Sequence, residues 1–247
     1  KRFVINSLCV WLIFNNCYFY HAATGVGYNF METNTNSIYM NNCYVHNAIN
    51  RIILNNNASQ YNNTVFAYGN TNLMKGLTTS TLNNCRFRFA FTTFSANLST
   101  NVFNNCQWEL TAVNTDFGTA TISGGTYTNT TGAFTNTGVV TGLSGYTTTS
   151  TYTNAGNFIN NYLSGTSVTF VASKTNVPSI ISGNTGINVT VNNSYGAFYN
   201  NSGFKLATSA QLYGGTIIYD SNNEIDKTKF ARIADNLSAP YVYQPQN

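Results

Sequence analysis

The chain has 247 residues; 7% are charged, 15% aromatic and 43% hydrophobic, and the formal net charge is +4. This composition excludes a disordered chain, which combines low hydrophobicity with high net charge. The eleven basic residues are spread along the chain, which argues against a nucleic-acid groove of clustered Lys and Arg. No apolar stretch approaches the ~20 residues that span a bilayer, so we expect no membrane insertion.

A six-residue phrase begins at Phe14 and recurs along the first half of the chain. It consists of an apolar residue, two small polar residues that are mostly Asn-Asn, a slot residue, any residue, and another apolar residue. From position 43 to position 106 the slot recurs every 21 residues, and such a period indicates a solenoid. The slots are Cys17, Cys43, Thr64, Cys85 and Cys106, each preceded by Asn16, Asn42, Asn63, Asn84 and Asn105.

The phrase has a simple physical interpretation as one rung of stacked strands. Strand side chains alternate, so slot residue Cys17 and Phe19 point inward while Tyr18 points outward. The Asn-Asn step makes the bend before the strand, and stacked bends allow the amides to form a hydrogen-bonded ladder. The cysteines lack metal-site spacings, so we expect buried thiols that behave as small hydrophobes, and no metal or cofactor.

Weaker copies of the phrase follow downstream, and loops of variable length separate them. We place them at the six-residue or shorter stretches that begin at Ile122, Leu143, Ile159, Ile181, Tyr199 and Leu212. The predicted fold is therefore all-β: a right-handed single-stranded parallel β-helix of about ten coils of ~21 residues over 1–217.

The last part of the chain, 218–247, differs from the repeats because it is rich in charged residues. Apolar residues Ile225, Phe230, Ile233 and Leu237 have roughly helical spacing, which predicts a short amphipathic helix. We expect this non-solenoid segment to cap the open end of the solenoid or to contact other subunits. The apolar run that ends at Phe14 leads straight into the first repeat, and we expect the chain to be a piece of a longer protein.

The repeated phrase resembles the right-handed parallel β-helix family, to which pectate lyases and the tailspike and tail-fibre proteins of bacteriophages belong. The resemblance covers roughly residues 3 to 217 and implies a scaffold more than an activity. Pectate lyases use a calcium site of several Asp residues and an Arg base, and this chain lacks the Asp cluster.

The candidates for catalysis are few. Glycoside hydrolysis requires two carboxylates about 5 to 9 Å apart, and the repeats offer Glu109 and Asp116 on one coil as the best pair. His21 and His46 follow their slots by four and three residues, so they are expected to approach each other on adjacent coils. Neither has a nucleophile or third ligand beside it, so the interpretation leans away from an enzyme.

Outward aromatic residues are the better functional signal. A flat apolar ring together with amide groups suits sugar binding, and tyrosine is equally common at subunit interfaces. Arg86 and Arg88 are read as two outward residues of one strand. The candidate ligand-binding residues are Tyr18, Tyr20, Tyr44, Arg86, Arg88 and Tyr152.

The leading hypothesis is a structural and host-attachment component of an extracellular fibre, a phage tail fibre or tailspike that works as a homotrimer. Its partners would be host-surface polysaccharide or another receptor and other virion proteins, and its location the virion tail. The first alternative is a polysaccharide depolymerase with a site on the flank or between subunits. The second is a bacterial surface adhesin or an ice-binding solenoid, suggested by threonine-rich stretches such as 126–128 and 147–149.

Overall fold

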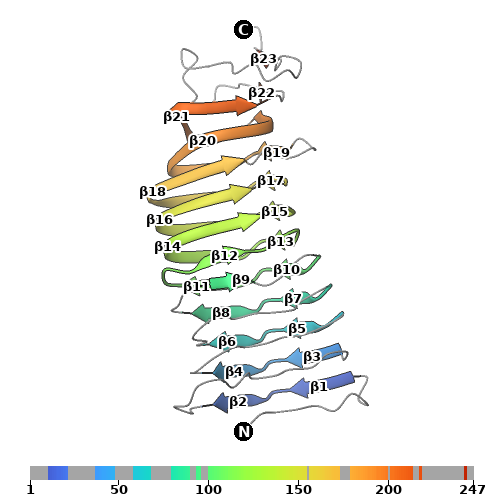
Figure 1. Cartoon of the computed structure of the whole chain (residues 1–247). Coiled ribbons are helices and arrows are strands. Elements are labelled where there is room, and N and C mark those ends of the chain that lie inside the picture. Colours follow the sequence, from blue (N-terminus) through green and yellow to red (C-terminus); the bar gives the residue numbers. More distant parts are fainter. Residues whose placement is uncertain are drawn as a thin grey trace.

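The structure, a computed structural model, describes residues 11–21, 37–47, 58–67, 79–89, 93–95, 100–154, 156–172, 179–199, 201–213, 217–218 and 242–243. The predicted fold class is confirmed: strands of successive repeats stack in parallel into one elongated β-solenoid (Figure 1). The amphipathic helix expected after residue 220 lies outside the described residues.

The first side of the solenoid carries the strands that precede each bend. These short strands pair in parallel with the next repeat along the body, and residues 196–199 of β20 complete the series between β19 and β22. The strands are β1 (Trp11–Asn15), β3 (Ser37–Asn41), β5 (Gln60–Asn62), β7 (Thr81–Asn83), β10 (Val102–Asn104), β13 (Thr121–Ser123), β15 (Val139–Thr141), β17 (Phe158–Ile159), β19 (Ser179–Ser182), β22 (Ile217–Ile218) and β23 (Val242–Tyr243).

The second side carries the strands that follow the bend. They are β2 (Tyr18–His21), β4 (Tyr44–Asn47), β6 (Val65–Ala67), β8 (Arg86–Phe89), β11 (Gln107–Leu110), β14 (Thr126–Asn136), β16 (Ser144–Asn154), β18 (Tyr162–Ala172), β20 (Thr185–Tyr199) and β21 (Ser202–Tyr213). From β14 onward the strands are long enough to bend and continue along a third side. That side begins with β9 (Thr93–Ser95) and β12 (Asn114–Asp116), which pairs with the second half of β14.

The register shows how far the 21-residue period extends. Asn41, Asn62, Asn83 and Asn104 follow one another in register at steps of 21 residues. The next steps shorten to 19 residues at Ser123 and then to 18. The repeat is therefore shorter in the second half of the chain than the predicted 21, because the turns between the sides shorten and the long strands replace separate ones.

The bend between the first two sides is a left-handed residue in every early repeat. The second Asn of each phrase has a φ between 48° and 53°, a backbone conformation that Asn tolerates better than other non-glycine residues. The amides of the first Asn form a continuous ladder, in which Asn41, Asn62 and Asn83 donate to the residue one repeat below at 2.8, 2.7 and 2.8 Å. The ladder locks the register of neighbouring repeats.

The core is a column of rings and thiols inside the solenoid. Cys43, Thr64, Cys85 and Cys106 lie in register and are buried, and all the described cysteines are free thiols. Beside this column Phe66, Phe87 and Trp108 stack with ring centroids 5.4 and 5.7 Å apart. The column is filled by apolar surface from each repeat, and neighbouring repeats cover it on both sides.

Three of the downstream phrases are corrected by the register. The slot column continues with Gly125, Leu143, Asn161, Asn184 and Asn201, because each accepts a backbone hydrogen bond from the following rung. The phrases expected to begin at Leu143, Ile159 and Tyr199 are thus displaced by three, one and one residues. The cause is that these rungs start at Val140, Phe158 and Phe198 and replace the first Asn by Thr141, Ile159 and Tyr199.

Candidate functional site

The outer face of the second side is the surface that gathers most of the predicted site residues. Two outward columns run along it in register, one residue from each strand. The first column is Tyr18, Tyr44, Val65, Arg86, Gln107, Thr126, Ser144 and Tyr162, and the second is Tyr20, His46, Ala67, Arg88, Glu109, Thr128, Tyr146 and Ser164.

The N-terminal end of this face is aromatic. Tyr18 stacks on Tyr44 with ring centroids 5.1 Å apart, and Tyr20 stacks on His46 at 4.8 Å. Tyr18 and Tyr20 remain 66% and 60% exposed, so they present their rings to solvent. We call these four residues the aromatic patch. The register pairs His46 with Tyr20 and His21 with Asn47, so the expected approach of His21 to His46 is wrong.

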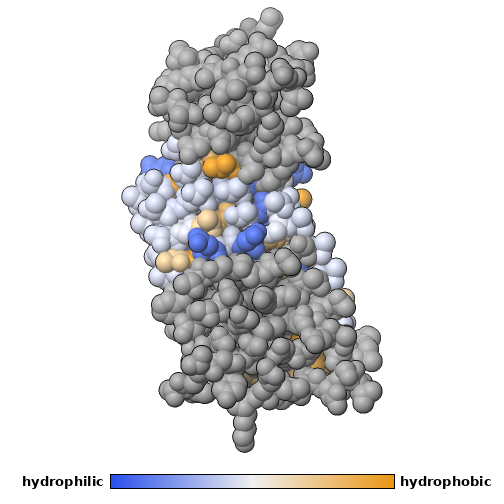
Figure 2. All heavy atoms as spheres, in the orientation of Figure 1, coloured by the Kyte–Doolittle hydropathy of each residue, from blue (hydrophilic) through white to orange (hydrophobic). Residues whose placement is uncertain are grey.

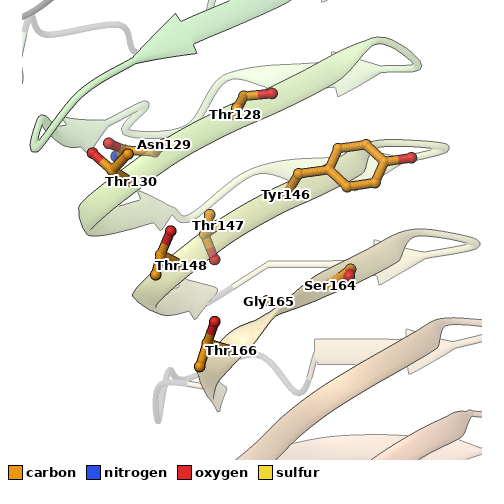
Figure 3. A pocket seen from close by; sticks show the side chains of 9 residues that line it. All are labelled: Thr128, Asn129, Thr130, Tyr146, Thr147, Thr148, Ser164, Gly165 and Thr166. Carbon is orange, nitrogen blue, oxygen red and sulfur yellow. The ribbon is translucent and has the colours of Figure 1, made fainter.

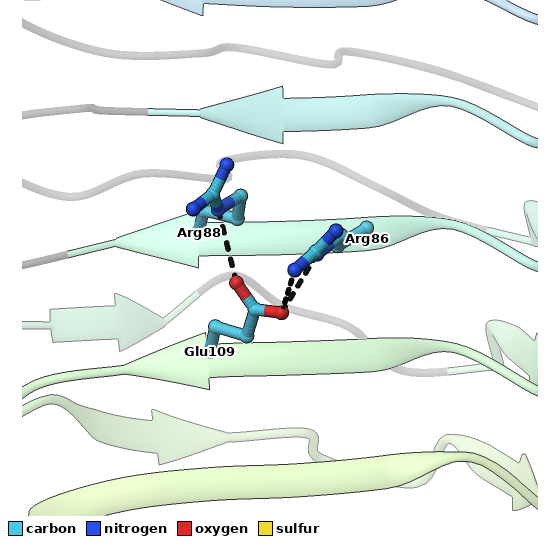
Figure 4. A network of polar contacts seen from close by, with 3 residues as sticks. All are labelled: Arg86, Arg88 and Glu109. Atoms are coloured by element: carbon cyan, nitrogen blue, oxygen red, sulfur yellow. Dashed lines mark hydrogen bonds and ion pairs between the residues drawn. The ribbon is translucent and has the colours of Figure 1, made fainter.

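The middle of the face holds an ion-pair cluster. Glu109 on β11 binds Arg86 and Arg88 on β8: Oε1 accepts from Nε and Nη2 of Arg86, and Oε2 lies 2.9 Å from Nε of Arg88 (Figure 4). The three side chains are 36% to 44% exposed. Two guanidinium groups share one carboxylate, so the cluster keeps a net positive charge and unused donors.

The second candidate carboxylate, Asp116, has a different partner and place. Its Oδ1 accepts a hydrogen bond of 2.9 Å from the backbone N–H of Gly118, so it caps a turn. It belongs to β12 on the third side, whereas Glu109 lies on the second side. The sequence-based pair is thus divided between two sides, with each carboxylate already bound.

A hollow of about 340 Å³ opens next to the ion-pair cluster, at the corner between the second and third sides. Three strands contribute three consecutive residues each: 128–130 of β14, 146–148 of β16 and 164–166 of β18 (Figure 3). The ladder passes from the Asn129–Thr147 pair to the Thr131–Thr149 pair, so the strands bend at the third residue of each triplet. No lining residue carries a charge.

The hollow arises because the middle residues of the triplets become smaller from one rung to the next. Asn129 fills its place and donates to the Val113 carbonyl at 2.7 Å and to the Tyr127 hydroxyl at 2.9 Å. Thr147 is smaller, and Gly165 has no side chain at all. A Cβ at Gly165 would lie 2.1 Å from the Thr147 carbonyl oxygen, so no larger residue fits there without a shift.

Two tyrosines near the hollow differ from their predicted positions. Tyr152, a predicted outward ligand-binding residue, is buried at 1% exposure, because it follows the bend of β16 and points into the core beside Phe134. Tyr146, which the displaced phrase places in the inward slot, is 46% exposed and lies at the edge of the hollow. The bend reverses the alternation on which the assignment of Tyr152 rests.

The polar groups in the hollow are only partly satisfied within the protein. The Oγ1 of Thr147 is buried and has no hydrogen-bond partner, although the residue is 6% exposed and lines the hollow. Burial and the nearby Tyr127 raise the pKa of Tyr152, and the Thr147 hydroxyl offsets this shift only partly. A hydroxyl of this kind is a free donor and acceptor at the floor of a hydroxyl-lined cavity.

Other kinds of site are not seen in the part of the chain that the structure describes. Its His, Cys, Asp and Glu residues form no group of three or more that could hold a metal ion. No helix among these residues is long and apolar enough to cross a membrane. Burial raises the pKa of the Cys43 and Cys106 thiols, which keeps them protonated inside the core.

Comparison with known proteins finds no matching family model, no similar curated protein and no similar solved structure. The function therefore has to be argued from the outer face of the second side: its aromatic patch, ion-pair cluster and hollow. Figure 2 shows that the described residues on the visible face are mostly of intermediate hydropathy, with scattered polar and apolar spots.

Proposed function

We propose that this chain is a structural and attachment segment of an extracellular fibre, and that the outer face of the second side binds carbohydrate on a host surface. The observation that carries the proposal is the register of that face. Exposed rings, spare guanidinium donors and hydroxyl groups follow one another along a single straight surface. Aromatic rings offer an apolar face to a sugar ring, and hydroxyl and guanidinium groups offer hydrogen bonds to its oxygens.

The body of the protein suits a mechanical role. Each repeat is tied to the next by backbone pairing and by the Asn ladder, so the solenoid resists bending and register slippage. Its low charge favours side-by-side packing of copies of the chain, and we assign a homotrimer within a virion tail, as in the tailspike and tail-fibre proteins that the repeat resembles. Other virion proteins would hold its ends.

A direct test combines oligomeric state with glycan binding. We expect the purified chain to be trimeric by size-exclusion chromatography with light scattering, and to bind a subset of bacterial surface polysaccharides on an array. Tyr18→Ala with Tyr20→Ala should abolish or weaken binding, because it removes the two most exposed rings. Tyr39→Ala, an outward tyrosine on the first side, is the matched control. A monomer that binds none of the polysaccharides contradicts the proposal.

A second candidate, an ice-binding solenoid, is favoured by a specific feature of the third side. Two hydroxyl-rich columns run outward in register there: Thr131, Thr149 and Ser167, and next to them Thr151, Thr169 and Thr190. Thermal hysteresis of the purified protein separates this function from attachment. The depolymerase alternative is tested by release of reducing ends from capsular polysaccharide, with Glu109→Gln and Asp116→Asn as variants.

A further inference from the structure

We infer that the hollow at the corner of β14, β16 and β18 is a binding site for one uncharged sugar unit. This inference rests on the proposed function and deepens it, because it assigns a site and a class of sugar. Three features of the hollow carry it: its size, the chemistry of its lining, and a buried hydroxyl left without a partner.

The size suits one small ligand. Ligand sites in proteins have volumes of about 300 to 1,000 Å³, and the hollow of about 340 Å³ lies at the lower end of that range. It is also a fixed feature of the backbone, since Gly165 accepts no side chain and its carbonyl is held by the Asn188 amide at 3.0 Å. The hollow is thus present before a ligand arrives, which lowers the entropic cost of binding.

The lining selects a neutral, polyhydroxylated ligand. Its residues are Thr, Ser, Asn, Tyr and Gly, so it offers many hydroxyl donors and acceptors and no charge. The nearest carboxylate along the face, Glu109, pairs with Thr128 in register but is bound to Arg86 and Arg88. The Tyr146 ring stands at the edge, where it can cover the apolar face of a sugar ring (Figure 3).

The floor supplies the decisive observation. The Thr147 hydroxyl is buried and unbonded, and burial of a polar group without a hydrogen bond costs free energy. Figure 3 shows this side chain between the Asn129 and Gly165 rungs, with its hydroxyl directed toward the Gly165 rung, where no side chain fills the space. A sugar hydroxyl placed there would satisfy it, so the protein carries a small instability that a ligand removes.

The test uses the full chain and ligand-observed NMR with methyl glycosides of glucose, galactose, mannose and N-acetylglucosamine, and with methyl glucuronide and sialic acid as charged probes. We expect at least one neutral glycoside to bind and the charged probes to bind more weakly. Thr166→Tyr should block binding, because Thr166 is exposed and lines the hollow, so a larger side chain fills it. Ser167→Tyr, next to it and outside the lining, is the control.

Thr147→Val separates a ligand-binding role from a structural one. We expect about tenfold weaker binding of the neutral glycoside from the loss of one hydrogen bond. The melting temperature without ligand should rise by about 2 °C or more, since a buried unpaired hydroxyl is removed. A fall in melting temperature would mean that the hydroxyl serves the fold and would overturn this part of the argument. Thr149→Val, exposed on the same strand, should change neither quantity.

The remaining outcomes are also decisive. Binding of charged probes alone, binding that Thr166→Tyr leaves unchanged, or no binding by the whole panel overturns the inference. The proposed function survives each of these if polysaccharide binding still depends on Tyr18 and Tyr20. If neutral glycosides occupy the hollow while the chain is a monomer that ignores polysaccharides, the site stands and the fibre function fails.

Discussion

The hydroxyl of Tyr152 occupies the space that a side chain at Gly145 would fill: a Cβ built on Gly145 would lie 2.6 Å from it. The two residues stand on the same strand, β16, on either side of the bend. One rung below, the position of Gly145 is held by Tyr127, whose ring is buried in the same core. The core therefore keeps a tyrosine in this region on both rungs but draws it from opposite halves of the strand.

The first prediction is that Gly145→Ala destabilises the protein. The added methyl group would meet the Tyr152 hydroxyl and the Leu163 side chain, which lies 2.8 Å from the same Cβ position. Overpacking of this kind costs about 1 to 3 kcal/mol, or a fall in melting temperature of about 2 to 4 °C per kcal/mol. The double variant Gly145→Ala with Tyr152→Phe should recover part of the loss in a double-mutant cycle, and additive effects would contradict the contact.

The second prediction concerns the left-handed bends at the Asn-Asn steps. Asn63 has a φ of 48° and is exposed, so its backbone conformation matters more than its burial. Asn63→Val should lower the free energy of unfolding by about 1 to 2 kcal/mol, because a branched residue is strained there. Asn63→Gly should cost clearly less, since glycine adopts this conformation freely. Equal losses in urea denaturation for the two variants would argue against strain.

Much of the first half of the solenoid could be predicted from the sequence, because the same residue types return at a strict period. The 21-residue step also contained an unused signal: Arg88 and Glu109 are separated by one full repeat, which places them opposite each other. Past Gly125 the slot changes from Cys to Leu143 and then Asn161, and the phrase loses its markers. The register there follows only from the backbone pairing.

The hollow could not be predicted for a related reason. It depends on the decreasing side-chain size from Asn129 through Thr147 to Gly165, three residues that only the register brings together. It also depends on the bend at the third residue of each triplet, which ends the simple alternation of inward and outward side chains. The same bend buries Tyr152, so one local feature explains both the missed site and the wrong residue.

The third prediction is that the buried amide column of Asn161, Asn184 and Asn201 is essential for stability. Asn184 donates to the Phe158 carbonyl at 2.9 Å and accepts from the Asn161 backbone N–H at 2.8 Å. Asn184→Ala leaves both groups buried and unpaired, at about 1 to 3 kcal/mol each. We expect the melting temperature to fall by about 5 °C or more. Thr185→Ala, exposed and next in the chain, should have little effect; a similar loss there would contradict the prediction.

The fourth prediction is a loss of stability at alkaline pH. Burial raises the pKa of Tyr127 to about 12, and it also raises the pKa of Cys106 and of Tyr152. In the unfolded chain these groups ionise near pH 8.5 to 10, so the unfolded state releases protons that the folded state keeps. Stability is then complete below about pH 8.5 and falls as the pH rises toward 12. A denaturation midpoint that stays constant from pH 7 to 11 would contradict this assignment.

The last prediction is that the ion-pair cluster contributes little to folding, as a surface available for binding should. Glu109 is bound by Arg86 and Arg88, but all three side chains are more than one third exposed, so solvent screens their attraction. Glu109→Gln should therefore cost less than about 1 kcal/mol in low salt, and the difference should shrink in 1 M NaCl, where the Debye length falls to about 3 Å. The same variant frees both guanidinium groups, so binding of acidic polysaccharide should strengthen while binding of a neutral glycoside in the hollow stays constant. A large, salt-independent loss of stability would show that the cluster serves the fold instead, and the attachment face would then be reduced to the aromatic patch and the hollow.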